Sequence, residues 1–222
     1  MIHNQIQVRR LNVRPPLLLA PMAGLTHSAL RTLLLAFGGV GLLSTEMLSA
    51  RRLPAESPSL SPYLVRTAGE SPLSYQLLVA AAEEVAPAVE TLHRLGADVI
   101  DLNLGCPAPK VRQAGGGSSL MADPQRVRRI VSTARALTSL PLTAKIRLGE
   151  TLDEGRLREF CQMLAEEGID LLTVHARLRK EPFGRKPRWE WVGRVKDWLR
   201  IPVIANGGVC SVATARECLR IS

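Results

Sequence analysis

A single cysteine stands in a short motif at which an apolar run gives way to a loop. Residues 103–117 read NLGCPAPKVRQAGGG, so that Cys106 lies between Gly105 and Pro107. A thiol there can be a nucleophile, which requires a nearby histidine base or a helix N-terminus. It can also be a general acid, which requires only reach and an unlowered pKa. A buried structural cysteine is the remaining alternative, although the glycine and the proline beside Cys106 favour a fixed, exposed loop position.

Polar residues recur at every second position in the apolar runs of the chain. Successive side chains of a strand point to opposite faces, so residues two apart share a face. This period assigns the following polar residues to one common face: Glu46, Gln76, Asp101, Asn103, Thr143, Lys145, Arg147, Thr173, His175, Arg177 and Asn206. The residues between them, such as Ile100 and Ile146, are apolar. His175 alone could be a satisfied core residue, but an unpaired lysine inside a protein is costly. Lys145 therefore indicates a binding site.

The apolar runs alternate with helical patterns along the whole chain. The runs cover 16–22, 41–48, 73–80, 98–106, 141–148, 171–177 and 202–208. The helical patterns cover 27–37, 83–95, 124–138, 154–167, 189–199 and 211–220, and 49–72 is loop-like and rich in Pro and Ser. Such alternation predicts a parallel sheet, and without a nucleotide-binding glycine fingerprint it favours a (β/α)₈ TIM barrel in the α/β class. Barrel active sites lie at the C-terminal ends of the strands, where these polar residues fall.

The seven runs also predict where the barrel is incomplete. We expect one domain, 1–222, truncated after about seven β/α units, so that the eighth strand is absent. A barrel that lacks a strand has two unpaired edges, which is a liability for stability and aggregation.

The donors on the common face predict the chemistry of a ligand. Lysine, arginine, histidine, asparagine and glutamine suit an electron-rich ligand with many acceptors. The segment 205–208 reads ANGG and predicts a tight turn with free backbone N–H groups, at a place where barrels commonly hold phosphate. Together these features predict flavin mononucleotide (FMN), with Lys145 stabilising negative charge on the reduced ring.

Charge and cysteine content narrow the class of protein. Lys and Arg total 29 against 20 for Asp and Glu, a net charge of +9, which indicates an anionic partner such as nucleic acid, unless it reflects solubility or a basic proteome. The chain has 4 cysteines and no CxxC pair, so we expect neither a metal site nor a disulfide framework, and Cys161 is predicted to be core. Prolines interrupt the N-terminal apolar run and no run approaches about 18 apolar residues, so we expect a cytoplasmic protein without a membrane partner.

The order and spacing of several motifs resemble the flavin-dependent tRNA-dihydrouridine synthase (Dus) family. The motifs are LAPMAGLTHSALR (19–31), TEM (45–47), VIDLNLGCPAPKVRQAGGGSSLM (99–121), AKIRLG (144–149), VHAR (174–177) and IPVIANGG (201–208). The block around Cys106 with its glycine run is specific, whereas VHAR or NGG alone would be weak. The glycine run and the spacing after GCP are most similar to the DusC-like bacterial members.

The resemblance implies an oxidoreductase that reduces the C5=C6 bond of a D-loop uridine in tRNA, with FMN as cofactor and NADPH as reductant. It implies that Cys106 is the general acid and that Asn103, Arg147 and Arg177 bind the substrate. It also implies a cofactor site formed by Pro21, Met22, Ala23, Gln76, Lys145, His175, Asn206, Gly207 and Gly208. A monomer is expected, without a metal. The family's eighth strand, which carries a Gly-Arg phosphate loop, and its C-terminal helical tRNA-binding domain are absent from these residues.

Two further expectations concern flexible or charged segments. The glycines of 115–117 are predicted to form a mobile rim that lets Cys106 close over a flipped base. Segment 177–200 is a candidate tRNA contact, or else a solvated surface, because its basic residues outnumber its acidic ones. The basic residues are Arg177, Arg179, Lys180, Arg185, Lys186, Arg188, Arg194, Lys196 and Arg200, against Glu181, Glu190 and Asp197.

Two other functions stay open. A flavin barrel could act on free pyrimidines, as dihydroorotate and dihydropyrimidine dehydrogenases do. A truncated remnant could be inactive, or could only bind RNA. The positive charge and the spacing from GCP to GGG favour tRNA.

Overall fold

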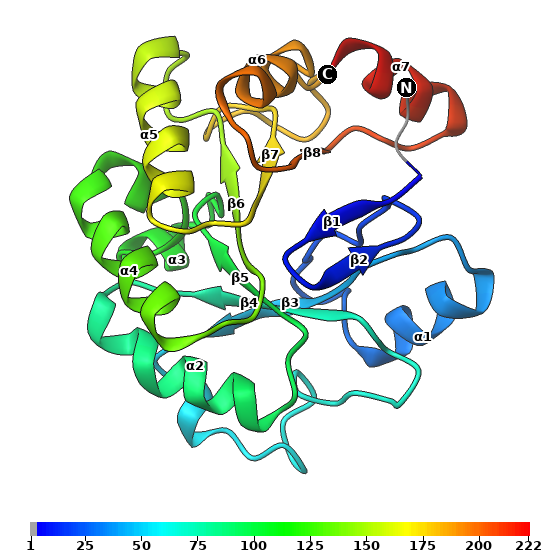
Figure 1. Ribbon diagram of the computed structural model, residues 1–222, viewed down its shortest axis with the longest axis vertical. Coiled ribbons are helices and arrows are strands. Elements are labelled where there is room, and N and C mark those ends of the chain that lie inside the picture. The colour runs from blue at the N-terminus through cyan, green and yellow to red at the C-terminus, as the bar shows by residue number, and fades with distance from the viewer. Residues whose placement is uncertain (1–3) are drawn as a thin grey trace.

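The computed structural model describes residues 4–222, and its main feature is a curved parallel sheet (Figure 1). The strands are β3 (Leu43–Ser49), β4 (Leu73–Leu78), β5 (Val99–Asn103), β6 (Leu142–Arg147), β7 (Leu171–His175) and β8 (Val203–Asn206). They pair in chain order, and every pair is parallel. This is the strand order of a TIM barrel, as the alternating pattern predicts.

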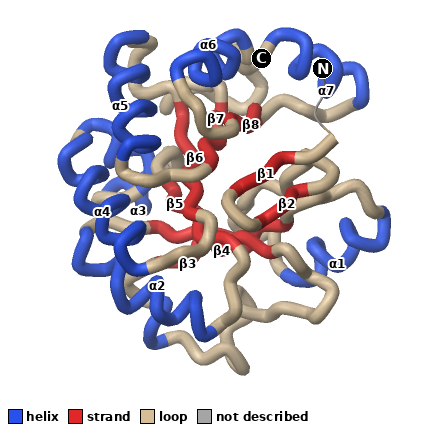
Figure 2. Tube along the Cα trace, in the orientation of Figure 1, coloured by secondary structure: helices blue, strands red, loops and turns tan. Residues whose placement is uncertain are grey.

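Helices cover the outside of this sheet, whereas the strands lie inside (Figure 2). They are α1 (Ser28–Phe37), α2 (Val85–Arg94), α4 (Pro124–Leu137), α5 (Glu154–Glu166), α6 (Glu190–Trp198) and α7 (Val212–Ile221). Local sequence sets their starts: the Asp123 side chain accepts a hydrogen bond from the Arg126 amide at the beginning of α4, and Pro124 occupies the first turn. Cys161 is fully buried in α5, as predicted, and burial raises the pKa of its thiol to about 12.

The predicted first strand, 16–22, is reduced to one isolated bridge. Leu18 pairs in parallel with Leu42, and the amide of Leu19 donates to the carbonyl of Leu42 at 2.9 Å. Prolines at 15, 16 and 21 have no N–H group and limit the ladder on both sides. The predicted strand 16–22 therefore lies at the expected place beside β3, but it is much shorter than predicted. No strand pair joins β8 to this bridge among residues 4–222, so the described sheet is open between its two ends.

An antiparallel hairpin that the sequence analysis missed covers the N-terminal end of the barrel. Its strands are β1 (Ile6–Val8) and β2 (Leu11–Val13). Val13 packs with Leu42 and Val99 near the starts of two barrel strands. Arg9 forms an ion pair with Asp170, directly before β7, at 2.7 Å. The turn lacks the glycine or asparagine that usually marks a hairpin, and Arg9 itself adopts a positive φ of 52°.

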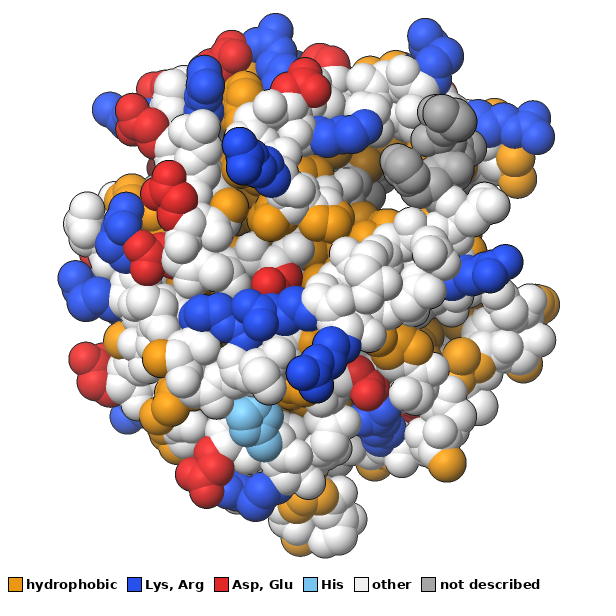
Figure 3. Space-filling model, viewed as in Figure 1, with side chains coloured by type: hydrophobic (Ala, Val, Ile, Leu, Met, Phe, Trp, Pro, Cys, Tyr) orange, Lys and Arg blue, Asp and Glu red, His pale blue; other side chains and the backbone are white. Residues whose placement is uncertain are grey.

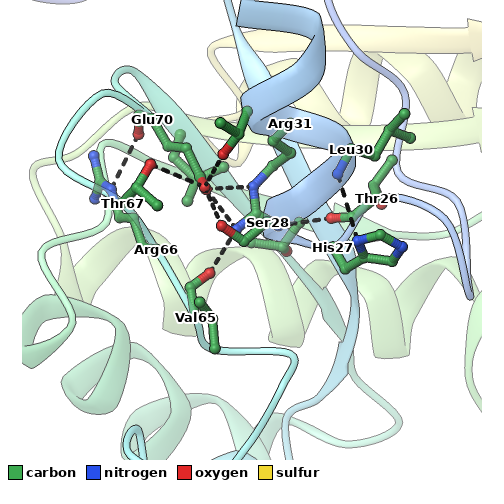
Figure 4. A network of polar contacts seen from close by, with 12 residues as sticks. Thr26, His27, Ser28, Leu30, Arg31, Val65, Arg66, Thr67 and Glu70 are labelled. Carbon is green, nitrogen blue, oxygen red and sulfur yellow. Dashed lines mark hydrogen bonds and ion pairs between the residues drawn. The ribbon is translucent and has the colours of Figure 1, made fainter.

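A buried ion pair fixes α1 to the segment before β4 (Figure 4). Arg31 is 1% and Glu70 0% exposed, and Arg31 Nε donates to Glu70 Oε2 at 2.6 Å. The remaining guanidinium nitrogens donate to the carbonyls of Thr26 and Val65, both at 2.6 Å, and the Ser28 hydroxyl donates to the same carboxylate. Every charged atom of the pair thus has a partner, which a buried pair requires.

The surface carries charges of both signs. Figure 3 shows basic and acidic side chains interspersed over one face of the molecule. None of the helices formed by residues 4–222 is long and apolar enough to cross a membrane.

Candidate active site

Three neighbouring strands bring a glutamine, an aspartate and a threonine side by side. Gln76 on β4 pairs in register with Asp101 on β5, and Asp101 pairs with Thr143 on β6. Gln76 Nε2 donates to Asp101 Oδ2 at 2.5 Å, and Thr143 Oγ1 donates to Asp101 Oδ1 at 2.5 Å. Burial raises the pKa of Asp101, although both hydrogen bonds and the charge of Lys145 oppose the rise. These polar residues therefore share a face, as the period of two predicts.

The side chain of Asn103 joins this cluster to the loop that carries Cys106. Asn103 Nδ2 donates to Gln76 Oε1 at 2.7 Å. Asn103 Oδ1 accepts hydrogen bonds from the amides of Cys106, at 2.9 Å, and of Gly105, at 3.2 Å. Cys106 is half-buried and directly follows the C-terminal end of β5. The thiol therefore lies at the mouth of the barrel, on a backbone fixed from below by Asn103.

The glycines after Cys106 form a packed support, which corrects the prediction of a mobile rim. Gly116 and Gly117 are buried. The chain turns into α3 (Pro109–Gln113) and then a 3₁₀ helix (Gly117–Ala122). Gly117 has a φ of +59°, and a Cβ there would lie 2.6 Å from the carbonyl oxygen of Cys106. The glycines are thus required for close contact with the cysteine loop rather than for freedom of movement.

Lys145 reaches the interior of the barrel without a partner. Its Nζ forms neither a hydrogen bond nor an ion pair with any side chain or carbonyl of residues 4–222. The residue lines a cavity of about 50 Å³ together with Pro21, Thr173 and Asn206. Burial lowers the pKa of Lys145 to about 8, and the charge of Arg147 adds to this effect, while Asp101 opposes it. A free ammonium group inside a polar cavity is suited to an anionic or electron-rich ligand.

His175 is neutral and its tautomer is defined by Arg177. Arg177 Nη1 donates to His175 Nε2 at 2.7 Å, so Nε2 accepts and the ring proton is on Nδ1. Burial lowers the pKa of His175 to about 3, and the charges of Lys145, Arg147 and Arg177 contribute further. The imidazole can therefore donate from Nδ1 but does not act as a cation at neutral pH.

The loop that follows β7, within the segment 177–200 predicted as a candidate tRNA contact, folds against these residues. Arg177 Nη2 donates to the carbonyl of Phe183 at 2.6 Å, and Arg177 Nε donates to that of Arg185 at 2.7 Å. Glu181 accepts a hydrogen bond from the Leu178 amide at 2.9 Å and pairs with Arg188. The guanidinium of Arg177 is thus engaged in shaping the loop, and its contact with a substrate stays a prediction.

Phe183 lies beside the site, and the period of two could not find it because it belongs to this loop and not to a strand. Its ring stacks on His175 with centroids 6.0 Å apart. The guanidinium carbon of Arg147 lies 5.8 Å from the centre of the same ring, and Arg147 Nη1 donates to the carbonyl of Leu178. Phe183 is 76% exposed. The sequence offered only an aromatic residue within the basic segment 177–200 as a signal.

The turn after β8 has the predicted backbone form. Gly207 and Gly208 have φ values of +93° and +74°. Neither amide donates a hydrogen bond to an atom of the described chain. A Cβ at Gly207 would lie 2.5 Å from His175 Nε2, and one at Gly208 would lie 2.6 Å from Pro187 Cγ. The two glycines therefore form a cradle of free amides beside the histidine, which is suited to a phosphate group.

The loop after the first bridge lies at the same end of the barrel. Pro21 lines the cavity, whereas Met22 and Ala23 are exposed. The amide of Gly24 donates to Glu46 Oε2 at 2.5 Å, which ties this loop to β3. A contact of Met22 and Ala23 with a cofactor remains a prediction.

The charges of segment 177–200 are largely paired within the protein. Ion pairs join Arg179 and Lys180 to Glu150, Arg185 and Arg188 to Glu181, Lys186 to Glu217, and Arg194 to Glu154. The excess of positive charge that the sequence suggests is therefore smaller at this surface than the count of residues implies, and its contact with tRNA stays a prediction.

Comparison with known proteins now decides the family. Residues 18–222 match the family model described as Dihydrouridine synthase (Dus). The chain belongs to the dihydrouridine synthase family. The resemblance carried by the motifs around Cys106 is thereby confirmed.

Individual Dus relatives agree with this assignment. The chain is 36% identical over 214 residues to the probable tRNA-dihydrouridine synthase 1 of Synechocystis sp., covering 96% of this chain and 60% of that protein. It is 41% identical over 216 residues to the tRNA-dihydrouridine(16) synthase of Pseudomonas putida, covering 92% of this chain and 65% of that protein. The chain thus spans less than two thirds of the length of these relatives.

Solved structures confirm the barrel fold of this Dus chain. Histamine dehydrogenase from Rhizobium sp. 4-9 superimposes with a TM-score of 0.73 at 14% identity, over 99% of this chain and 44% of that one. The old yellow enzyme homologue from Zymomonas mobilis superimposes with a TM-score of 0.67 at 11% identity, over 99% of this chain and 85% of that one. At such low identity the likeness concerns the fold alone.

Proposed function

We propose that this chain is the catalytic barrel of a tRNA-dihydrouridine synthase that reduces the C5=C6 bond of a D-loop uridine. The observation that carries the proposal is the thiol of Cys106, held by Asn103 at the barrel mouth, beside the strand that carries Lys145 and Arg147. The names of the relatives support tRNA as the substrate, and that of the Pseudomonas putida protein suggests uridine 16 as the first target to test. A net charge of +9 suits a polyanionic partner in the cytoplasm.

The chemistry of the site fits FMN. The amides of Gly207 and Gly208 would hold its phosphate, because neither donates a hydrogen bond within the described chain. Lys145 would bind the electron-rich part of the ring, and His175 would donate a hydrogen bond from Nδ1. Pro21 lines the cavity beside Lys145, and Gln76 is hydrogen-bonded to Asp101, which lines the same cavity, so both remain in the proposed cofactor site.

The protein's own contribution to the reaction is to position the uracil and to supply a proton. The electrons that saturate the C5=C6 bond would come from bound FMN, with NADPH as the reductant. Asn103 and Arg147 orient the base, which must leave its stack to enter the barrel mouth. Cys106 would donate its thiol proton to C5, and the cationic side chains of Lys145 and Arg147 lie on the strand next to the one that leads to this thiol.

Product analysis tests the proposal directly. The protein is incubated with FMN, NADPH and unmodified tRNA, and dihydrouridine is measured by mass spectrometry. We expect product with the wild type and a loss of about 100-fold or more with Cys106→Ala, because a general acid contributes at least that factor. Cys210→Ser, which alters an exposed thiol outside the cluster, is the matched control and should keep its activity.

The other outcomes separate the competing functions. Turnover of free uracil or dihydroorotate without tRNA would favour an enzyme of free pyrimidines. Absence of both bound flavin and product would favour an inactive or RNA-binding module. Equal rates for the wild type and Cys106→Ala would show that another group supplies the proton.

A further inference from the structure

Asp101 is a buried charged residue for which the proposed reaction has no direct use. It is 7% exposed and lies beneath the barrel mouth, two residues before Asn103 on the same strand. A carboxylate is expensive to remove from water, so its presence inside the barrel is explained only if its hydrogen bonds perform a task.

The carboxylate dictates the orientation of the neighbouring amide. Both carboxylate oxygens of Asp101 accept hydrogen bonds, one from Gln76 and one from Thr143, so Gln76 turns its NH₂ group toward Asp101. The reverse orientation would place two acceptor oxygens at the 2.5 Å separation that now joins Gln76 Nε2 to Asp101 Oδ2. Because its NH₂ group donates to Asp101, Gln76 can interact with Asn103 only through Oε1, which accepts a hydrogen bond.

The same logic continues from Gln76 to the cysteine loop. Gln76 Oε1 accepts from Asn103 Nδ2 at 2.7 Å, which leaves Asn103 Oδ1 to face the amides of Gly105 and Cys106. The backbone amides of Gly105 and Cys106 can only donate, so they require the side-chain oxygen of Asn103 to face them. This is the same orientation of Asn103 that follows from the hydrogen bond between Asp101 and Gln76. All members are satisfied in one arrangement, which makes the cluster rigid.

We propose that Asp101 is a positioning residue for Cys106: it orients the amides of Gln76 and Asn103, and Asn103 holds the backbone that carries the thiol. The role of Cys106 in catalysis rests on the proposed function, whereas the mechanical link from Asp101 to Cys106 does not. The competing explanation is that Asp101 acts only through its charge on Lys145, whose side chain also lines the cavity above it.

Two substitutions at Asp101 distinguish these explanations. Asp101→Asn removes the charge but retains an oxygen that can accept from Gln76, while its NH₂ group donates to the Thr143 hydroxyl. Asp101→Leu removes both. We expect Asp101→Asn to form dihydrouridine within about threefold of the wild-type rate and Asp101→Leu to lose about tenfold, the factor that one lost hydrogen bond of about 1.4 kcal/mol produces. Equal losses in the two variants would assign the effect to charge and overturn the proposal.

A double-mutant cycle tests whether the effect passes through the thiol. In the Cys106→Ala background, Asp101→Leu should reduce the residual rate by less than about twofold, because there is no thiol left to position. A full tenfold loss in that background would show that Asp101 supports the barrel in general, and the proposal would fail.

A readout without tRNA keeps this proposal separate from the proposed function. In a Cys210→Ser background, Cys106 is the only thiol of residues 4–222 that is not buried. Its alkylation by iodoacetamide, followed by peptide mass spectrometry, should be at least about threefold faster in Asp101→Leu than in Asp101→Asn or wild type, because the loop is released. Should Asp101→Leu not fold, Gln76→Leu removes the hydrogen bond between Gln76 and Asn103 in the same chain of hydrogen bonds. It should also accelerate the alkylation of Cys106. Unchanged rates in the variants that fold would overturn the proposal, even if wild-type protein makes dihydrouridine.

Discussion

At the scale of single residues, the site consists of ionisable groups whose pKa values are set by burial. Burial lowers the pKa of His175 to about 3 and that of Lys145 to about 8. At neutral pH the imidazole is therefore uncharged, while the lysine is mostly protonated. The two groups lie on neighbouring strands, with Lys145 paired to Thr173 and Arg147 paired to His175. One cation and one neutral donor thus lie on adjacent strands.

Stability should depend on the neutral state of His175. Its folded pKa of about 3 lies below its ordinary value of 6.5, so the stability it contributes is present above pH 6.5 and is lost as the pH falls toward 3. The slope is at most about 1.4 kcal/mol per pH unit. Urea unfolding at about pH 7 and about pH 4 should show a smaller loss of unfolding free energy in His175→Gln than in the wild type. Identical losses in the two proteins would contradict the assigned pKa.

Cofactor affinity should follow the charge of Lys145. Because its pKa is about 8, the ammonium group is present below that pH and is lost above it. Quenching of flavin fluorescence should show weaker FMN binding as the pH rises through about 8 in the wild type. Lys145→Met should bind more weakly below about pH 8 and lack this transition, and Lys145→Arg should also lack it because its guanidinium stays charged through pH 8. A transition that persists in Lys145→Met would belong to another group.

At the scale of elements, the strands deliver side chains and the turns after them complete the site. Neighbouring strands hold Gln76, Asp101 and Thr143 in register, and the loop after β5 presents Cys106. Neither turn has room for a side chain at its glycine, because Gly117 packs on Cys106 and Gly207 packs on His175. At both positions glycine allows the backbone to approach a neighbouring residue more closely than any side chain would permit.

The turn after β8 should not tolerate a side chain. Gly207→Ala would force a methyl group to within 2.5 Å of His175 Nε2 at a φ of +93°. We expect a loss of about 1–3 kcal/mol in unfolding free energy and at least about tenfold weaker FMN binding. Gly184→Ala is the matched control, because a Cβ there meets nothing within 4 Å and should change stability by less than about 0.5 kcal/mol. Equal effects at the two glycines would show that the cradle is not confined.

At the scale of the whole molecule, the outer layer is fixed to the barrel by a buried ion pair. Arg31 on α1 and Glu70 before β4 are both nearly inaccessible to solvent. Burial raises the pKa of Glu70, but hydrogen bonds from Ser28 and Arg31 and the charge of Arg31 outweigh it, so that the pKa is lowered overall. The stability that this pair contributes is thus present above the ordinary pKa of 4.5 and is lost as the pH falls below it.

Removing the negative charge of this pair should be strongly destabilising. Glu70→Gln leaves the guanidinium of Arg31 buried without a counter-charge, which costs about 3–5 kcal/mol. Glu90→Gln removes the partner of Arg94 in an exposed pair on α2, and we expect a cost below about 0.5 kcal/mol. Thermal unfolding at neutral pH compares the two variants with the wild type. A cost for Glu70→Gln no greater than that for Glu90→Gln would mean that the buried pair carries little stability.

Much of the architecture follows from pattern alone. The alternation of apolar runs and helical patterns predicts β3 to β8 and their helices to within a few residues, because both periods report burial directly. The pattern missed the β1–β2 hairpin, because the turn residue Arg9 has a positive φ and no glycine or asparagine marks the turn in the sequence. It overestimated the first strand, where proline removes the ladder donors.

The sequence by itself determined the kind of site: a period of two places Lys145, Arg147 and His175 on one face, and the motif around Cys106 indicates the family. Only the tertiary structure decided how these groups work together. It fixes the tautomer of His175 through Arg177, reveals Phe183 and Glu181 beside the site, and connects Asp101 to Cys106 through two amides. The reason is physical. Periodicity encodes which face a residue occupies, whereas strand register and loop packing determine which atoms come within hydrogen-bonding distance.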